Sequence, residues 1–346
     1  MVTLGTDSHK ATHTVVATDE TGRQLGQGTF QANEDGHLKA LHWASRWGER
    51  RWALEDCRHL SRRLERDLLG AGQTVVRVPP KLTAGARQGA RTTGKSDPID
   101  ALAVARAALR EPGLPLAELD GPSRELRLLV GHRENLVGER TRIQNRLRWH
   151  LHELAPGTEP QLGALDRPKT LMALEQQLAS QSGLVAELAR EQVSSIRRLT
   201  QRIKQLEGEI GSRTAQLAPS LIALPGCASL TAAKVIGEVA GVRRFKSRAA
   251  FAMHNGTAPI PVWSGRADRF RLNRGGNRQL NAALHRIAIT QMRLDGAGKN
   301  YIAKRVTNGD TKMEAIRALR RRLSDEVYRR LWHDEGLSVV SLGDAA

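Results

Sequence analysis

Apolar and polar residues alternate along about the first thirty positions of the chain, which predicts three short strands joined as a meander. The predicted strands cover residues 2–7, 13–18 and 24–30, with a turn at 19–22. Further along, the pattern predicts helices over 35–47, 59–69 and 98–109 and strands over 51–55 and 74–78, the last closed by Pro79 and Pro80. Three antiparallel strands followed by alternating helices and strands indicate an α/β RNase H-like fold.

The middle of the chain, residues 123–218, has a helical and highly charged pattern that glycines and prolines interrupt around 155–168. Six apolar residues recur there at steps of three and four and line one narrow helix face: Val193, Ile196, Leu199, Ile203, Leu206 and Ile210. This seam predicts a coiled coil or a helical hairpin. We expect the seam to meet another chain, and the alternative is packing within its own hairpin, because one seam does not distinguish the two.

The last third of the chain predicts a mostly α-helical region. Residues 221–236 form a helix, a Pro225–Gly226 turn and a second helix, which resembles a helix-hairpin-helix that holds a DNA phosphate. Any two packed helices joined by Pro-Gly would look similar. Residues 257–265 are a loop, followed by a basic strand, a glycine turn and a helix.

Together these patterns predict four parts of the chain. They are an α/β catalytic domain with four candidate acidic residues over residues 1–115, a helical or coiled-coil dimerisation region over 116–218, a serine-bearing C-terminal domain over 219–295 and a helical tail over 296–346. With 346 residues and 40% apolar content, the chain is long enough for more than one core.

The amino-acid composition indicates which class of partner the chain binds. Lysine and arginine number 54 against 36 acidic residues, a formal charge of +18, which favours nucleic acid as the partner. Of these cations 43 are arginines, whose planar fork suits phosphates and guanine edges, although a GC-rich genome would also favour arginine codons.

Cysteine content and hydropathy bear on the compartment. Cys57 and Cys227 are isolated, which excludes a zinc knuckle or a disulfide framework and fits a reducing cytoplasm. We see no signal peptide and no apolar run of the roughly 20 residues that a membrane span needs. A cytoplasmic protein without a membrane partner is expected.

Four carboxylates fall at positions where the predicted fold brings chain segments together. Asp7 ends the first strand and Glu55 ends the fourth, while Asp97 and Asp100 lie three residues apart at the start of a helix. Carboxylates gathered in this way repel one another unless divalent cations lie between them, and hard oxygen ligands select Mg²⁺ or Mn²⁺. The alternative for Asp97 is a helix N-cap before Pro98, and the alternative for Asp100 is a first-turn carboxylate that the helix dipole stabilises. Asp7 is alternatively a turn residue and Glu55 a solvated strand end.

Near the C-terminus, Ser264 directly precedes Gly265 in a loop with basic surroundings. Residues 242–286 hold ten lysines or arginines and one acid. A hydroxyl in such a field suits nucleophilic attack on a phosphate, although the local sequence alone favours a turn serine in a DNA-binding loop. The residues that we expect to contact nucleic acid are Arg243, Arg244, Lys246, Arg248, Arg269, Arg271 and Arg278.

The front and back motifs together resemble the DEDD transposases of the insertion-sequence one-ten family. The resemblance covers about residues 2–110 and 219–292. The motifs are Asp7, Glu55 and the Lys95–Ala101 stretch KSDPIDA at the front, and Leu224-Pro-Gly, Ala258-Pro, Ser264-Gly and RGGNRQLN over 274–281 at the back.

This resemblance implies a RuvC-like N-terminal domain, a coiled-coil connector and a C-terminal transposase domain. It also implies dimers that pair into tetramers, with the acidic site of one subunit completed by the serine of another, and a structured guide RNA, called a bridge RNA, that pairs with donor and target DNA. In that scheme Asp7, Glu55, Asp97 and Asp100 hold Mg²⁺, and Ser264 forms a covalent 5′-phosphoserine link to DNA. The runner-up function is a Holliday-junction-resolvase-like nuclease that uses activated water, and a third is a nucleic-acid-binding protein without catalysis.

Overall fold

The computed structural model describes residues 1–343 apart from 56–59, 89–93, 95, 112, 115, 119–120, 162 and 263–269, with backbone only over 337–343. The chain divides into two compact units, Met1–Asp120 and Gly121–Ala346. Ser264, Arg269 and Cys57 lie outside the described residues.

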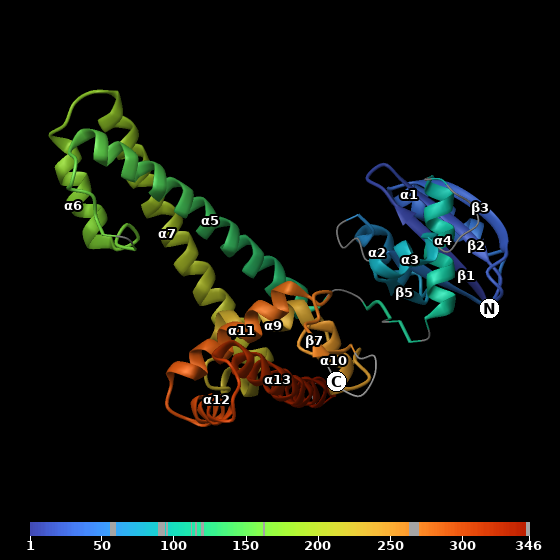
Figure 1. The fold of residues 1–346 in the computed structure, drawn as a ribbon. Helices are drawn as coiled ribbons and strands as arrows, with labels where there is room; N and C mark the ends of the chain where they lie inside the picture. Colours follow the sequence, from blue (N-terminus) through green and yellow to red (C-terminus); the bar gives the residue numbers. More distant parts are fainter. Residues whose placement is uncertain are drawn as a thin grey trace. The chain divides into compact units, whose positions relative to one another are not determined.

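The first unit is built on a five-stranded mixed sheet (Figure 1). Its strands are β1 (Val2–Ser8), β2 (Thr12–Thr18), β3 (Gln24–Gln31), β4 (Arg50–Glu55) and β5 (Val75–Val78), in the order β3-β2-β1-β4-β5. The β1–β2 and β2–β3 pairs are antiparallel, whereas β1–β4 and β4–β5 are parallel. This topology confirms the predicted RNase H-like fold.

Helices cover both faces of this sheet, because alternate residues of the central strands point to opposite sides. Leu4, Trp52 and Leu54 pack on one face, against α1 (Glu34–Ala44) and α2 (Arg62–Gly70). On the other face, Ala53, Val76 and Val78 pack against α3 (Pro80–Gln88) and α4 (Asp97–Arg110).

Helix α4 lies unusually close to the central strand β1. A Cβ atom at Gly5 would lie 2.7 Å from the Cβ of Ala105, so only glycine permits this approach. Gly5 pairs with Ala53 on β4, and the two small side chains make a shallow seat for α4. This seat sets where the first turn of α4 meets the end of β1.

In this unit the sequence analysis missed one helix, and one of its alternatives was wrong. Helix α3 was missed, because Pro79 and Pro80 read as the end of a strand, whereas Pro80 occupies the first position of a helix. The N-cap of α4 is Ser96 and not Asp97, since Ser96 has extended backbone angles (φ −154°, ψ 155°) and Asp97 is already helical. The carboxylate of Asp97 is therefore available for a different contact.

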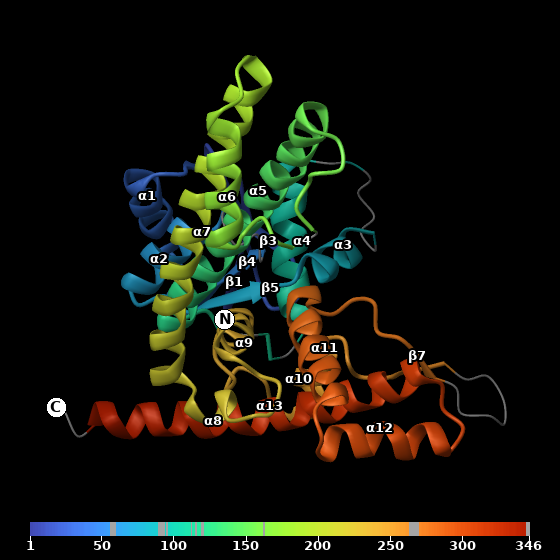
Figure 2. The same cartoon turned by 90° about the vertical axis from the view of Figure 1, so that its left-hand side faces the viewer.

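The second unit begins with a long helical hairpin. Helix α5 (Pro122–Leu154) and helix α7 (Leu184–Leu217) run side by side, with α6 (Pro168–Ala179) packed near the far end (Figure 2). The seam predicted on α7 is buried within this chain. Towards the tip of the hairpin, its residues pack against Ile143, Leu147 and Leu151 of α5 and against the leucines of α6. Towards the base, they belong to the main hydrophobic core of the second unit. The expectation that the seam meets another chain was wrong, because the hairpin already fills it.

The rest of the second unit packs around the base of the hairpin. Its elements are α8 (Pro219–Ile222), α9 (Ser229–Val239), α10 (Arg248–His254), β6 (Ile260–Pro261), β7 (Phe270–Arg271), α11 (Arg278–Arg293), α12 (Ala297–Thr307) and α13 (Lys312–Gly343). Helices α8 and α9 flank the predicted Pro225–Gly226 turn, and Gly226 has the positive φ (81°) that this turn requires. Within the described part of the chain, every helix is too short or too polar to serve as a membrane span.

Candidate active site

The carboxylate of Asp7 lies at the end of β1, where its side chain is only 14% exposed. Asp7 follows Gly5 by two residues, and Glu55 follows Ala53 by two residues on the neighbouring parallel strand. Because side chains alternate along a strand, both carboxylates extend on the face that α4 covers. The sheet thus presents two acids at one edge, as the sequence predicted from the strand ends.

The other two acids come from the first turn of α4. Asp97 is the first residue of that helix and Asp100 follows three residues later, so the two lie on neighbouring positions of one face. The close packing of α4 on Gly5 places this turn against the end of β1. The negative charges of Asp97 and Asp100 are near enough to raise the pKa of Asp7. Three of the four predicted acids are therefore near neighbours.

His9 joins two of these acids and was missed by the sequence analysis. Its Nε2 atom lies 3.0 Å from Oδ2 of Asp7 and 3.4 Å from Oδ1 of Asp97. Among the described residues, Asp7, His9 and Asp97 offer three ligand atoms that all lie within 4.8 Å of one another. Two carboxylate oxygens and an imidazole nitrogen at this spacing fit one divalent metal ion.

The electrostatics of Asp7 also favour a cation. Burial raises the pKa of Asp7 above its usual value; His9 opposes the rise, while the negative charges of Asp100 and Asp97 add to it. The ionised form of Asp7 is thus less favourable than that of a solvent-exposed aspartate, and a bound cation would offset that cost.

Asp100 has a cationic partner from the helix that the sequence analysis did not predict. Nη1 of Arg87, in the last turn of α3, lies 2.7 Å from Oδ1 of Asp100. The arginine holds one carboxylate oxygen of Asp100 and leaves the second for another contact. Recognising α3 from the sequence would have placed Arg87 within reach of this acid.

The described basic residues that were predicted to contact nucleic acid differ in exposure and in their contacts within the protein. Lys246, Arg248, Arg271 and Arg278 have exposed side chains. Arg244 instead donates from Nε to the carbonyl oxygen of Val239 at 2.7 Å, and its guanidinium lies 4.5 Å from the Phe245 ring centre. Arg243 is exposed, with its guanidinium 4.9 Å from the ring centre of Trp332.

The fold and the acidic cluster together define an RNase H-like protein with a cluster of side chains that could hold a divalent metal ion. Family models narrow this class. One, described as a transposase and named for the DEDD transposases of IS110, matches residues 4–156. A second, described as the transposase IS116/IS110/IS902 family, matches residues 218–303. The chain belongs to this IS110/IS116 family of insertion-sequence DEDD transposases.

Full-length relatives agree with this assignment. The chain is 28% identical over 379 residues to the uncharacterized 44.8 kDa protein of insertion element IS116 from Streptomyces clavuligerus, covering 95% of this chain and 94% of the relative. It is 26% identical over 392 residues to the uncharacterized 42 kDa protein of IS900 from Mycobacterium paratuberculosis, covering 95% of each. Among solved structures it is similar to T. thermophilus RuvC in complex with a Holliday junction substrate, at 16% identity, a TM-score of 0.25, and coverage of 32% of this chain and 93% of RuvC.

Proposed function

We propose that this chain is a metal-dependent transposase that cleaves and rejoins DNA strands, with Asp7, Glu55, Asp97 and Asp100 as the metal ligands. The observation that supports this most directly is the convergence of Asp7, His9 and Asp97 at the end of β1 in a chain of the transposase family. The positive charge of the chain supports DNA as the substrate.

Each acidic residue has a separate task in this proposal. Asp7 and Asp97 present oxygens from two elements, and Glu55 adds a carboxylate from the neighbouring strand. Arg87 fixes the orientation of Asp100 through one oxygen. Mg²⁺ or Mn²⁺ bound by these groups would polarise the scissile phosphate and stabilise charge on the attacking and leaving oxygens.

Ser264 is the proposed nucleophile, on the strength of the family resemblance and its basic surroundings. Its hydroxyl oxygen would lose its proton and bond to the DNA phosphorus, while the 3′ oxygen of the neighbouring nucleotide leaves and takes up a proton. The product is a 5′-phosphoserine link. The reverse attack by a 3′ hydroxyl rejoins DNA without an outside source of energy, because the link conserves the phosphodiester bond.

The family resemblance further suggests a structured guide RNA and assembly as dimers that pair into tetramers. The α5–α7 seam lends this assembly no support, since its apolar face is filled by the chain itself. An intersubunit surface would have to involve other residues.

The test is to incubate the protein with guide RNA, substrate DNA and Mg²⁺ and to separate the products under denaturing conditions. We expect a covalent protein–DNA adduct that disappears in Ser264→Ala and in Asp97→Asn and persists in the control Ser212→Ala, an exposed hydroxyl that bonds only within α7. Loss of one such preorganised group should slow the reaction about 10²- to 10³-fold or more.

Three other outcomes would count against the proposal. Strand cleavage without any adduct would identify water as the nucleophile. Cleavage that survives Asp97→Asn would remove the acidic cluster from the chemistry. Binding of DNA or RNA without cleavage by the wild-type protein would indicate a binding protein.

A further inference from the structure

The serine-bearing segment leaves and re-enters the described chain at a short two-stranded ladder. Ile260 pairs with Arg271 and Pro261 pairs with Phe270, so β6 and β7 hold the two ends of residues 262–269 beside each other. Two residue pairs are too few to be stable alone. The position of β6 and β7 therefore depends on the contacts at the base of this ladder.

Asn255, just before β6, is a fully buried hub at that base. Its Oδ1 atom accepts hydrogen bonds from the backbone nitrogen and the hydroxyl of Thr257, at 3.1 and 2.6 Å. Its Nδ2 atom donates to Oγ of Ser324 in α13 at 2.7 Å, and Ser324 is also fully buried. A buried amide whose oxygen and nitrogen both have hydrogen-bond partners favours a single local conformation.

Asn281 of α11 ties this hub to α13 a second time. Its Nδ2 donates to the carbonyl oxygen of Asn255 at 2.8 Å, and its Oδ1 accepts from Nη1 of Arg320 at 2.9 Å. Arg320 and Ser324 are four residues apart and so lie on one face of α13. The same helix face thus holds Asn255 directly and through Asn281.

The other side of the ladder base is joined to the first through glycines. A Cβ atom at Gly276 would lie 2.5 Å from Cα of Gly256, so the two backbones touch without room for a side chain. The backbone nitrogen of Asn277 also donates to the carbonyl oxygen of His254, at 2.6 Å. The residues before β6 and those after β7 are therefore in direct contact at the base of the ladder.

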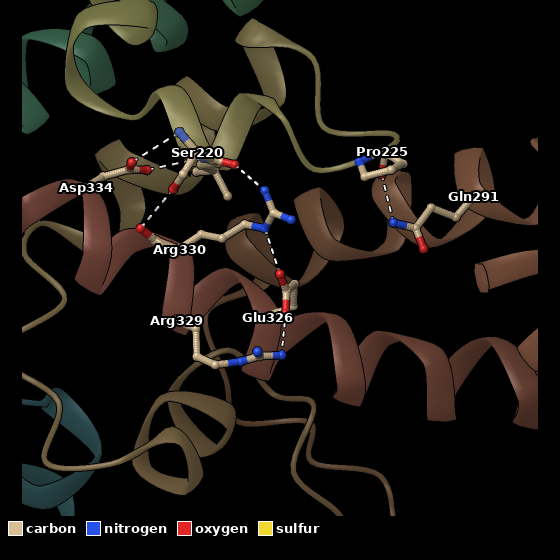
Figure 3. A network of polar contacts seen from close by, with 8 residues as sticks. Ser220, Pro225, Gln291, Glu326, Arg329, Arg330 and Asp334 are labelled. Carbon is tan, nitrogen blue, oxygen red and sulfur yellow. Dashed lines mark hydrogen bonds and ion pairs between the residues drawn. The ribbon is translucent and has the colours of Figure 1, made fainter. Parts of the chain in front are cut away.

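Helix α13 is itself anchored farther along its length (Figure 3). The carboxylate of Asp334 accepts from the backbone nitrogens of Ser220 and Leu221 at 3.1 and 3.2 Å, and Arg330 donates to the carbonyl oxygen of Ser220. Asp334 is 2% exposed, so this contact is shielded from water. Because α13 lies beyond residues 218–303, it is outside the part of the chain that the second family model matches.

We infer that α13 positions the serine-bearing segment, with Ser324 and Arg320 as positioning residues that fix Asn255 and Asn281 at the base of the β6–β7 ladder. This inference rests on the proposed role of Ser264. In the transposase the helix would supply no reacting group. It would fix β6 and β7, the strands from which the segment extends, during the proposed reaction.

The experiment combines hydrogen–deuterium exchange on the full chain with adduct formation on substrate DNA. The variants are Ser324→Ala and Arg320→Met, with Ser324→Thr as the conservative rescue and Ser212→Ala and Arg198→Met as exposed controls on α7. We expect peptides covering residues 253–262 and 270–281 to exchange about tenfold faster in the two variants, and peptides of α5 and α7 to be unchanged. Adduct formation should slow about tenfold with unaltered DNA affinity, and Ser324→Thr should restore it.

The two readouts separate this inference from the proposed function. If the wild-type protein forms no Ser264 adduct, the proposed chemistry fails, while the exchange data still decide whether α13 fixes the ladder base. Unchanged exchange in both variants, or an equal increase throughout the second unit, would overturn the inference. An unchanged rate of adduct formation in a variant with a loosened base would overturn it as well.

Discussion

Two buried imidazoles lie on the face of the sheet opposite α4. His13 of β2 and His37 of α1 are 2% and 1% exposed, and their ring centres are 5.2 Å apart. Burial, together with the neighbouring His37 and His9, lowers the pKa of His13 to about 4. His13 is thus neutral in the folded protein under conditions where an unfolded chain begins to bind a proton.

The folded protein should lose stability in mild acid for this reason. Because the folded pKa lies below the unfolded value of 6.5, the contribution of His13 is complete above pH 6.5 and is lost as the pH falls from 6.5 towards 4. The loss over that window is about 3 kcal/mol. Urea denaturation at a series of pH values would measure it. The variant His13→Phe should lose much of this pH dependence, the exposed control His42→Phe should keep it, and equal slopes in the two would contradict the prediction.

At the scale of elements, the seat of α4 on β1 is the contact that assembles the acidic cluster. Gly5→Ala would place a methyl group against the backbone of Ala101 and Ala105, so α4 must move away from the sheet. We expect destabilisation of about 1–3 kcal/mol or more and weaker binding of Mn²⁺. Urea denaturation and metal titration check both effects. The control is Gly48→Ala, where an added Cβ meets no atom within 4 Å; a loss as large as that of Gly5→Ala would rule out the packing explanation.

The apolar seam of α7 leads to a second prediction at this scale. Ile196 is fully buried between the helices of its own hairpin, so Ile196→Ala should cost about 2–5 kcal/mol through the cavity that it leaves. The fall in melting temperature should not depend on protein concentration, because no second chain contributes to the contact. Thermal unfolding at several concentrations tests this, with the exposed Leu184→Ala as control. A concentration-dependent loss would indicate an intermolecular seam.

The sequence predicted elements well where a strong period coincided with a clear start or stop signal. The meander, the parallel strands β4 and β5 and helix α4 were predicted within a few residues, and the strand ends located Asp7 and Glu55. His9 escaped because it lies in the turn after β1, where no periodic pattern marks it. Contacts between distant segments, such as Arg87 with Asp100 or Asn255 with Ser324, depend on tertiary packing that one sequence does not encode locally.

The sequence also could not predict which helix covers an apolar helix face. The repeat on α7 marks a buried face equally well whether the covering helix is α5 or a second copy of the chain. The structure resolved this through the matching apolar residues of α5 and α6. For the same reason, the importance of Gly5 was not visible in the sequence, since a glycine in a strand gains meaning only from the helix above it.

Over the whole molecule, positive charge is divided unevenly between the two units. Residues 1–120 hold 17 lysines and arginines against 15 acids, whereas residues 121–346 hold 37 against 21. The acidic cluster therefore belongs to a nearly neutral unit. The attraction for a polyanion comes almost entirely from the helical unit.

This division predicts where the salt dependence of DNA binding originates. Arg278 is exposed at the first position of α11, and Arg278→Gln should weaken duplex binding for all sequences and reduce the slope of log K against log salt by about 0.9. Fluorescence anisotropy at several salt concentrations measures the slope. Arg23→Gln, an exposed arginine of the neutral unit, should leave it unchanged. A comparable reduction in both variants would show that the two units share the electrostatic contact.

The hairpin of the second unit also sets a length scale. A straight helix of 33 residues, as in α5, extends about 50 Å at 1.5 Å per residue. That length equals about fifteen base pairs of a duplex laid alongside, at 3.4 Å per base pair. Ligands held at the two ends of α5 would thus be more than one turn of double helix apart.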